Sequence, residues 1–195
     1  MGNQLVSRLR DEGIELDEVA LDRLGRFTDI LMEWNGTHNL TGVHTVSAVH
    51  DNIVDALYPL TFIPRPNSLL DVGTGAGFPG LVLAIAWPDV PTVLAEPQGK
   101  RAAFLRFMGA ELELGQVEVA RARVEDLHRA PFDLITSRAV TDTKLLLDIT
   151  RHIADSQTHY LFYKGSRAAK ELETLETQPN YAIVQYAKRN YIWIK

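Results

Sequence analysis

The 195-residue chain contains no cysteine. This absence excludes disulfide bonds, thiolate metal ligands and cysteine nucleophiles, and it is typical of proteins from a reducing compartment. Long apolar runs are absent as well, and no stretch approaches the roughly 20 residues of a membrane-spanning helix. The N-terminus lacks the basic start and continuous apolar stretch of a secretory signal. We therefore expect a cytoplasmic protein that does not enter a membrane.

Metal-ligand patterns and an excess of positive charge are also missing. The six histidines are scattered without an HExxH pattern or other close spacing, so we expect no metal site. The net charge of −5 by itself argues against a nucleic-acid partner. The acidity is uneven, however, because residues 1–66 carry a net charge of −5 and residues 67–195 are neutral overall. The second segment is therefore compatible with a local basic patch.

The first 60 residues have the periodicity of helices. Apolar residues recur every three or four positions from Leu21 to Trp34, which predicts a helix that begins near Asp17, a favourable N-cap residue. We expect a loop over residues 35–42 to end this helix, and a second amphipathic helix to follow between residues 49 and 60. Pro64-Arg65-Pro66 stops the helical pattern.

The composition changes at these prolines, so we expect a helical extension over residues 1–66 and an α/β domain over residues 67–195. In the second segment short apolar runs alternate with helical stretches, which predicts right-handed crossovers and a parallel sheet. The expected strands lie at 68–72, 92–95, 117–120, 132–136 and 160–163, and the expected helices at 79–87, 99–114, 142–153 and 167–176.

Two further strand-like runs, 181–186 and 191–194, flank the polar Lys188-Arg189-Asn190. This arrangement predicts an antiparallel hairpin at the C-terminus. The expected fold class is therefore α/β, with a Rossmann-like, mostly parallel seven-stranded sheet that carries an N-terminal helical extension and a C-terminal hairpin.

A glycine-rich segment follows the first expected strand. Ligands of open parallel sheets bind at the carboxyl ends of the strands, so this first turn is the place to look for a site. Its sequence is Gly73-Thr74-Gly75-Ala76-Gly77-Phe78-Pro79-Gly80, with four glycines in eight residues. Glycine allows positive φ angles and the close approach of a ligand to the backbone. The segment therefore predicts a cofactor loop, in which Gly73, Gly75 and Gly77 contact the cofactor.

Two cofactors are compatible with this loop. Gly75 to Gly80 satisfies the GxGxxG pattern of dinucleotide sites, and Glu96 follows at the spacing of an acid that binds a ribose. The same acid would serve the ribose of NAD or of S-adenosylmethionine. Asp71, just before the loop, favours S-adenosylmethionine, which carries an ammonium and a sulfonium and has no pyrophosphate for a carboxylate to repel.

Two later segments occupy places that an adenosine site needs. The residues from Ala122 to Asp126 follow the third expected strand, where Val124 and Glu125 can meet the adenine edge; the acids there are also favourable at the start of a helix. Ser137-Arg138-Ala139 follows the fourth expected strand. For Arg138 the alternative to a functional role is an ordinary salt bridge, for which Asp71 and Asp133 are the expected partners.

Several strings together resemble the bacterial 16S ribosomal RNA guanine-N7 methyltransferases, also called methyltransferase G or glucose-inhibited division protein B. They occur in the family's order: Trp34-Asn35, His38-Asn39-Leu40-Thr41, Asp71 to Gly80, Gly99-Lys100-Arg101, Arg123-Val124-Glu125, Ser137-Arg138-Ala139 and Lys164-Gly165. The resemblance implies a class I methyltransferase domain over residues 67–195 and methylation of N7 of one guanine in 16S ribosomal RNA, free or within a small ribosomal subunit. We expect the protein to be a monomer.

The resemblance also implies roles for individual residues. Gly73, Phe78, Val124, Glu125 and Arg138 would contact S-adenosylmethionine, with Glu96 on its ribose. Arg138 and Lys164 would position the reactants, because guanine N7 carries no proton and its methylation needs no general base. The expected substrate contacts are Asn39, Thr41, Lys100, Arg101 and Arg123, and capping of the next helix is the alternative for Asn39 and Thr41. Arg106, Arg167 and Lys170 are further candidates for phosphate contacts.

This sequence departs from the family pattern at one place. Where the family has an Arg-His pair followed by an acid, the chain has Asp51-Asn52, although Asp55 keeps the acid. The loss of the basic pair, together with the acidic balance, keeps open a methyltransferase that acts on a small molecule or a protein. The GxGxxG match keeps open a nicotinamide-dependent oxidoreductase.

Overall fold

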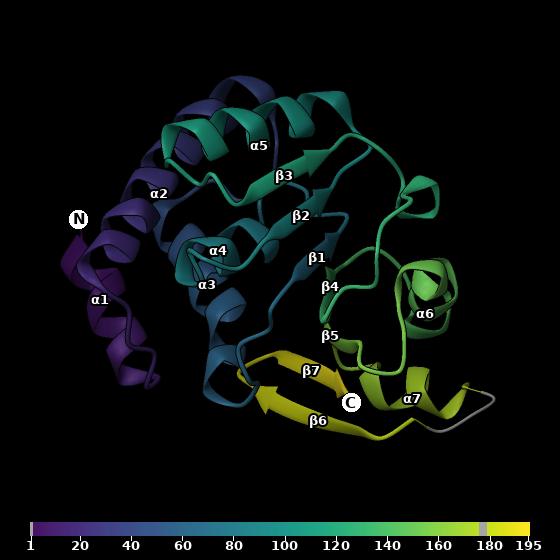
Figure 1. The fold of residues 1–195 in the computed structure, drawn as a ribbon. Coiled ribbons are helices and arrows are strands. Elements are labelled where there is room, and N and C mark those ends of the chain that lie inside the picture. Colours follow the sequence, from purple (N-terminus) through teal and green to yellow (C-terminus); the bar gives the residue numbers. More distant parts are fainter. Residues whose placement is uncertain (1, 176–178) are drawn as a thin grey trace.

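A seven-stranded sheet crosses the molecule in the order β3-β2-β1-β4-β5-β7-β6 (Figure 1). The chain is described by a computed structural model over residues 2–175 and 179–195. The first five strands are parallel, and β7 pairs antiparallel with both β5 and β6. The expected α/β fold with a mostly parallel sheet is confirmed. The strands are β1 (Leu69–Val72), β2 (Thr92–Ala95), β3 (Val117–Ala120), β4 (Leu134–Arg138), β5 (His159–Lys164), β6 (Tyr181–Tyr186) and β7 (Arg189–Ile194).

Helices cover both faces of this sheet (Figure 1). On one face lie α1 (Gly2–Asp11), α2 (Glu18–His38), α3 (Val46–Leu57), α4 (Gly80–Ala86) and α5 (Gly99–Glu111). On the other lie α6 (Thr143–Thr150) and α7 (Ala168–Glu173). Short 3-10 turns η1 (Tyr58–Thr61), η2 (Val124–Asp126) and η3 (Arg151–Ile153) complete the elements. None of the helices in the described ranges is long and apolar enough to cross a membrane.

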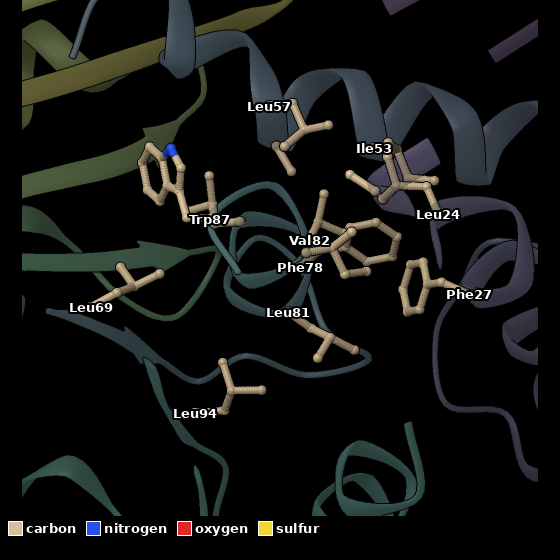
Figure 2. Packing of buried hydrophobic residues seen from close by; sticks show 14 of the residues in the cluster. Leu24, Phe27, Ile53, Leu57, Leu69, Phe78, Leu81, Val82, Trp87 and Leu94 are labelled. Carbon is tan, nitrogen blue, oxygen red and sulfur yellow. The ribbon is translucent and has the colours of Figure 1, made fainter. Parts of the chain in front are cut away.

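The central strands are buried on both faces, which explains their continuous apolar sequences. In β1, Leu69 packs into the cluster on the α4 face, and its neighbour Leu70 packs into the cluster on the α6 face. The N-terminal helices join the first of these clusters. Figure 2 shows Leu24, Phe27 and Ile53 from α2 and α3 beside Phe78 and Leu81 of the following α/β segment. The helical extension therefore fills the same core as the sheet.

The expected N-terminus of α2 is confirmed, because the carboxylate of Asp17 accepts a hydrogen bond from the Ala20 N–H at 2.7 Å. The expected start of the next loop at residue 35 is wrong. Asn35 is buried within α2 and binds the loop from inside, donating to the Val43 carbonyl and accepting from the Thr41 N–H. The helix instead ends at His38, and its C-cap Asn39 has a φ of 50°, which asparagine tolerates better than most residues.

The C-terminal hairpin is also tighter than expected. Arg189 and Asn190 were expected in the turn but lie in β7, and the chain reverses at Ala187 and Lys188. Helix α1 has no separate counterpart among the expected elements, since residues 2–11 were expected only to be helical. The strand order reverses between β1 and β4, and that is where an open parallel sheet binds ligands.

The close packing of α4 on β1 predicts opposite effects for two glycine substitutions. A Cβ on Gly80 would lie 2.6 Å from Asp71 Oδ2 and from Leu94 Cδ2, whereas a Cβ on Gly109 of α5 would meet no atom within 4 Å. We expect Gly80→Ala to lower the free energy of unfolding by about 1–3 kcal/mol or more. Gly109→Ala should raise it by about 0.5–1 kcal/mol. Equal effects in urea unfolding would contradict this packing.

Candidate cofactor and substrate site

The carboxylate of Asp71 holds the glycine-rich loop from inside the protein. Asp71 is 0% exposed. Its Oδ1 accepts a hydrogen bond from Thr136 of β4 at 2.8 Å. Its Oδ2 accepts one from the Gly80 N–H at 2.9 Å and another from the Thr74 hydroxyl. Burial nevertheless raises the pKa of Asp71 from 3.8 to about 6, because these donors compensate only part of the lost hydration.

This geometry corrects the role expected for Asp71. We expected its carboxylate to attract the positive groups of a cofactor directly, but both oxygens point to protein donors and the side chain has no exposed surface. Phe78, another expected cofactor contact, is also buried; its ring packs edge-on against Phe27 at 5.3 Å between centroids. Both residues therefore support the loop from its buried side.

Gly73 and Gly75 form the open side of the loop. Gly77, also expected to contact the cofactor, is instead buried, and a Cβ on it would lie 3.1 Å from Leu81 and 3.4 Å from Phe27 of the core. Gly73, Gly75 and Gly77 have φ angles of 69°, 60° and 104°, in the region that disfavours other residues. A Cβ on Gly75 would meet no atom nearer than 4.0 Å, so space for a ligand adjoins this residue. A Cβ on Gly73 would contact the side chain of Val140, which is exposed. The β4–α6 connection therefore lies beside the start of the loop.

Glu96 closes the loop from the carboxyl end of β2. Its Oε2 accepts from the Gly75 N–H at 2.9 Å, and its Oε1 accepts from the Gln98 N–H at 2.8 Å. The side chain is 2% exposed, so the carboxylate lies at the base of the site and is not displayed on the surface. Each carboxylate oxygen can accept a second hydrogen bond. Glu96 thus has the chemistry of a hydroxyl acceptor and already holds the loop backbone.

The segment after β3 separates into a buried and an exposed part. Val124, in η2, is buried, whereas Arg123 and Glu125 on either side of it are exposed. Val124 packs in the cluster on the α6 face together with Val72 and Ala95, which end β1 and β2. An apolar wall therefore lies at the same edge of the sheet as Glu96.

Arg138 does not make the salt bridges expected for it. Its Nη1 donates to Asn52 Oδ1 at 2.8 Å and to Asp55 Oδ2 at 3.2 Å, so both partners lie on α3 and neither is Asp71 or Asp133. The guanidinium carbon lies 4.9 Å from the centroid of the Phe78 ring, within the range of a cation–π contact. Nε and Nη2 make no hydrogen bond to any residue in the described ranges. These donors remain available to a ligand.

Asp55 is shared between two arginines. Besides Arg138, it accepts from Arg189 Nε and Nη2, both at 2.9 Å, and from the Tyr191 hydroxyl at 3.0 Å. Burial and the adjacent Asp55 charge raise the pKa of Tyr191, which keeps this hydroxyl a donor. Asp55 was noted in the sequence only as a retained acid, and nothing pointed to Arg189 as its partner. The cluster joins α3, the end of β4 and the hairpin.

Lys164 is buried at the end of β5 and bonds to two other segments. Its Nζ lies 2.8 Å from Glu171 Oε2 on α7 and donates to the Thr141 carbonyl at 2.7 Å. Glu171 also accepts from the Thr143 N–H and hydroxyl at the start of α6. Hydrogen bonds from Lys164 and Thr143 lower the pKa of Glu171 despite an opposing contribution from burial. Lys164 therefore joins three elements around the space beyond Arg138.

The remaining expected substrate residues lie at the α2–α3 loop and the start of α5. Asn39 and Thr41 shape the loop, since Asn39 is the C-cap of α2 and the Thr41 N–H donates to Asn35. Arg101 Nε donates to the Leu40 carbonyl at 3.3 Å, which fastens this loop to α5. Lys100, the neighbour of Arg101, is exposed. The structure brings Arg101 to this loop, and the capping expected of Asn39 occurs at the end of α2 and not at the start of α3.

The raised pKa of Asp71 predicts a pH-dependent stability difference. Between pH 4 and pH 6 the unfolded carboxyl is ionised while the folded one keeps its proton, so its contribution to stability falls as the pH rises through this window. We expect the destabilisation caused by Asp71→Asn to be about 2–3 kcal/mol larger at pH 4 than at pH 7. Chemical unfolding at both pH values measures it, and a pH-independent difference would contradict the shift.

The Asp55 cluster predicts a contrast between two aspartates on one helix. Asp55→Asn leaves Arg138 and Arg189 without their shared charge, so we expect a loss of about 1–3 kcal/mol in stability and weaker binding of S-adenosylmethionine. Asp51 is the matched control, because it pairs with Arg8 at the surface and its side chain is 63% exposed. Asp51→Asn should cost less than about 1 kcal/mol. Equal losses in thermal unfolding and calorimetry would contradict the cluster's role.

Comparison with known proteins identifies the family of this chain. Residues 20–191 match the family model described as rRNA small subunit methyltransferase G. The chain is 50% identical over 169 residues to ribosomal RNA small subunit methyltransferase G of Aliarcobacter butzleri, covering 87% of each chain. It is 44% identical over 191 residues to the protein of that name from Wolinella succinogenes, covering 98% of this chain and 97% of the other.

Solved structures show the same fold at lower sequence identity. A putative O-methyltransferase from Klebsiella pneumoniae superposes with a TM-score of 0.65 and 17% identity, covering 99% of this chain and 94% of the other. At this identity the likeness concerns the fold alone. The family follows from the sequence relatives and from the model match: the chain belongs to the rRNA small subunit methyltransferase G family.

Proposed function

We propose that this enzyme transfers a methyl group from S-adenosylmethionine to N7 of a guanine in 16S ribosomal RNA. The family match over residues 20–191 carries the proposal, because it includes the glycine-rich loop, Glu96, Arg138 and Lys164 in one chain. The placement of the loop at the switch between β1 and β4 supports it, since cofactors of such sheets bind there. The alternative of a nicotinamide-dependent oxidoreductase rests only on the GxGxxG spacing.

The residues at the loop fit S-adenosylmethionine. Glu96 would accept hydrogen bonds from the ribose hydroxyls with the lone pairs that Gly75 and Gln98 leave free. Gly73 and Gly75 would lie against the cofactor, and Val124 would contribute apolar surface beside the adenine. Glu125 would meet the adenine edge. Asp71 would act through the loop, because its own oxygens are occupied.

The chemistry requires positioning and no proton transfer. When bound, S-adenosylmethionine would supply an electrophilic methyl group to the lone pair of N7 and would leave as the neutral thioether. Guanine N7 carries no proton, so the absence of a basic dyad beside Arg138 in the described residues is compatible with the reaction. The remaining task is to hold N7 in line with the methyl carbon and the sulfur.

Arg138 has free donors in a place suited to that task. Asn52 and Asp55 hold Nη1, so Nε and Nη2 can donate to guanine O6 or to the carboxylate of the cofactor. A cation close to N7 would oppose the positive charge that the purine gains. Asp55 reduces this opposition, because it shares its negative charge with Arg138. Lys164 is neutralised in the same way by Glu171 and orders the substrate side of the site.

The proposed partner is ribosomal RNA, free or within a small ribosomal subunit, and the proposed location is the cytoplasm. We propose that the protein acts as a monomer. A methyltransferase for a small molecule or a protein was suggested by the loss of the basic pair at residues 51 and 52. Asn52 accepts a hydrogen bond from Arg138, so the changed residue still contributes a contact to this part of the site.

Nucleoside mass spectrometry of 16S ribosomal RNA tests the proposal. RNA from a strain that lacks the gene should contain one N7-methylguanine fewer than wild-type RNA. Incubation with the purified enzyme and S-adenosylmethionine should restore it, and an Arg138→Ala enzyme should restore it at least about tenfold more slowly, because it loses charge-assisted hydrogen bonds. An unchanged content of N7-methylguanine in the deletion strain would refute the assignment.

A further inference from the structure

A wide cleft opens at the carboxyl ends of β4 and β5, beyond Arg138. Its volume is about 840 Å³, within the range of ligand-binding clefts. One wall is the β4–α6 connection from Ala139 to Asp142, and the other is the first part of α7 with the end of β5. Val140, in the first wall, also lies beside Gly73 of the cofactor loop. The cleft and the loop therefore share one wall.

The cleft is basic although the chain as a whole is acidic. Five basic side chains line it, against two carboxylates: Lys144, Lys164, Arg167, Lys170 and Arg189 against Asp142 and Glu171. Both carboxylates are turned to protein donors, since Asp142 caps α6 through the Leu145 N–H and Glu171 binds Lys164 and Thr143. Arg189 is balanced by Asp55. The outward positive charge of the lining lies on Arg167 and Lys170, which are both exposed.

Arg167 and Lys170 dominate this outward charge. Arg167 is the N-cap residue of α7 and Lys170 lies in its first turn, and both line the cleft. Both are exposed, and neither forms an ion pair with any residue in the described ranges. Lys144, exposed on α6, lines the same cleft. A chain of phosphates is the complement of such a row, because phosphate contacts supply most of the affinity for RNA.

We propose that the RNA strand that carries the target guanine binds along this rim, with its phosphates on Arg167 and Lys170 and the unstacked base in the cleft. This inference rests on the proposed function and adds where the RNA substrate binds. It also divides the basic residues singled out in the sequence: Arg167 and Lys170 contact the strand at the target base, whereas Lys100 and Arg123 flank the other side of the cofactor loop.

Charge reversal on the rim tests this inference. Steady-state kinetics and filter binding would use 16S ribosomal RNA from a strain that lacks the gene. The test enzyme carries Arg167→Glu and Lys170→Glu. The control enzyme carries Arg10→Glu and Arg151→Glu, the same change in net charge at two exposed arginines outside the cleft, on α1 and at the far end of α6. Calorimetry with S-adenosylmethionine and thermal unfolding would accompany both.

For the rim enzyme we expect KM for RNA to rise by roughly tenfold or more, and the negative slope of log K against log salt to become shallower by about 1.4 for two lost phosphate contacts. Affinity for S-adenosylmethionine and thermal stability should match the wild type. The control enzyme should keep the wild-type KM and slope. An unchanged KM in the rim enzyme, or an equal rise in the control, would overturn the inference. Failure of the wild-type enzyme to methylate this RNA, both free and within small ribosomal subunits of the same strain, would instead refute the proposed function.

Discussion

The buried carboxylate of Asp71 is the constraint on which the arrangement of this molecule depends. A carboxylate without solvent must find donors within the protein, and Asp71 finds them on three elements: Thr136 on β4, Thr74 in the loop and Gly80 at the start of α4. These bonds fix the loop against the sheet at the point where strand order reverses. Gly80 must lack a Cβ because α4 starts so close to Asp71. Glu96 holds the opposite side of the loop.

Asp55 holds together the residues around Arg138, as Asp71 holds the glycine-rich loop. It gathers Arg138 from β4 and Arg189 from β7 onto α3, so the helical extension contributes to the site as well as to the core. Arg138 in turn lies over Phe78, whose ring packs on Phe27 of α2. The extension, the cofactor loop and the C-terminal hairpin therefore meet around one guanidinium group. Displacement of any one of them would shift the donors that Arg138 offers.

The sequence predicted the parts of the fold that depend on local pattern. The alternation of apolar runs and helical stretches predicted the sheet, because the central strands are buried on both faces and must be apolar throughout. Asp17 predicted the start of α2 through its capping bond. The glycine-rich segment predicted a loop with positive φ angles, which Gly73 and Gly75 have, and the binding of a ligand there stays a prediction.

The predictions that failed concern contacts between residues far apart in the chain. Nothing in the local sequence shows that the Asp71 side chain points inward to Gly80 and Thr136, or that Arg138 pairs with Asp55 across 83 positions. Arg189 was expected in a turn, since a polar triplet between two apolar runs has the composition of one, but its side chain is held in β7 by Asp55. Long-range electrostatic pairing of this kind follows from the fold and leaves no pattern in the neighbouring residues.

We propose that two acidic residues shape the loop for S-adenosylmethionine: Asp71 on its buried side and Glu96 beside Gly75. Isothermal titration calorimetry of the wild-type protein and Glu96→Gln with S-adenosylmethionine and with NADH measures this most directly. We expect the wild type to bind S-adenosylmethionine and not NADH, and Glu96→Gln to weaken the binding by roughly tenfold or more, because a charge-assisted acceptor is lost. Binding of NADH in place of S-adenosylmethionine, or equal affinity in the variant, would contradict it.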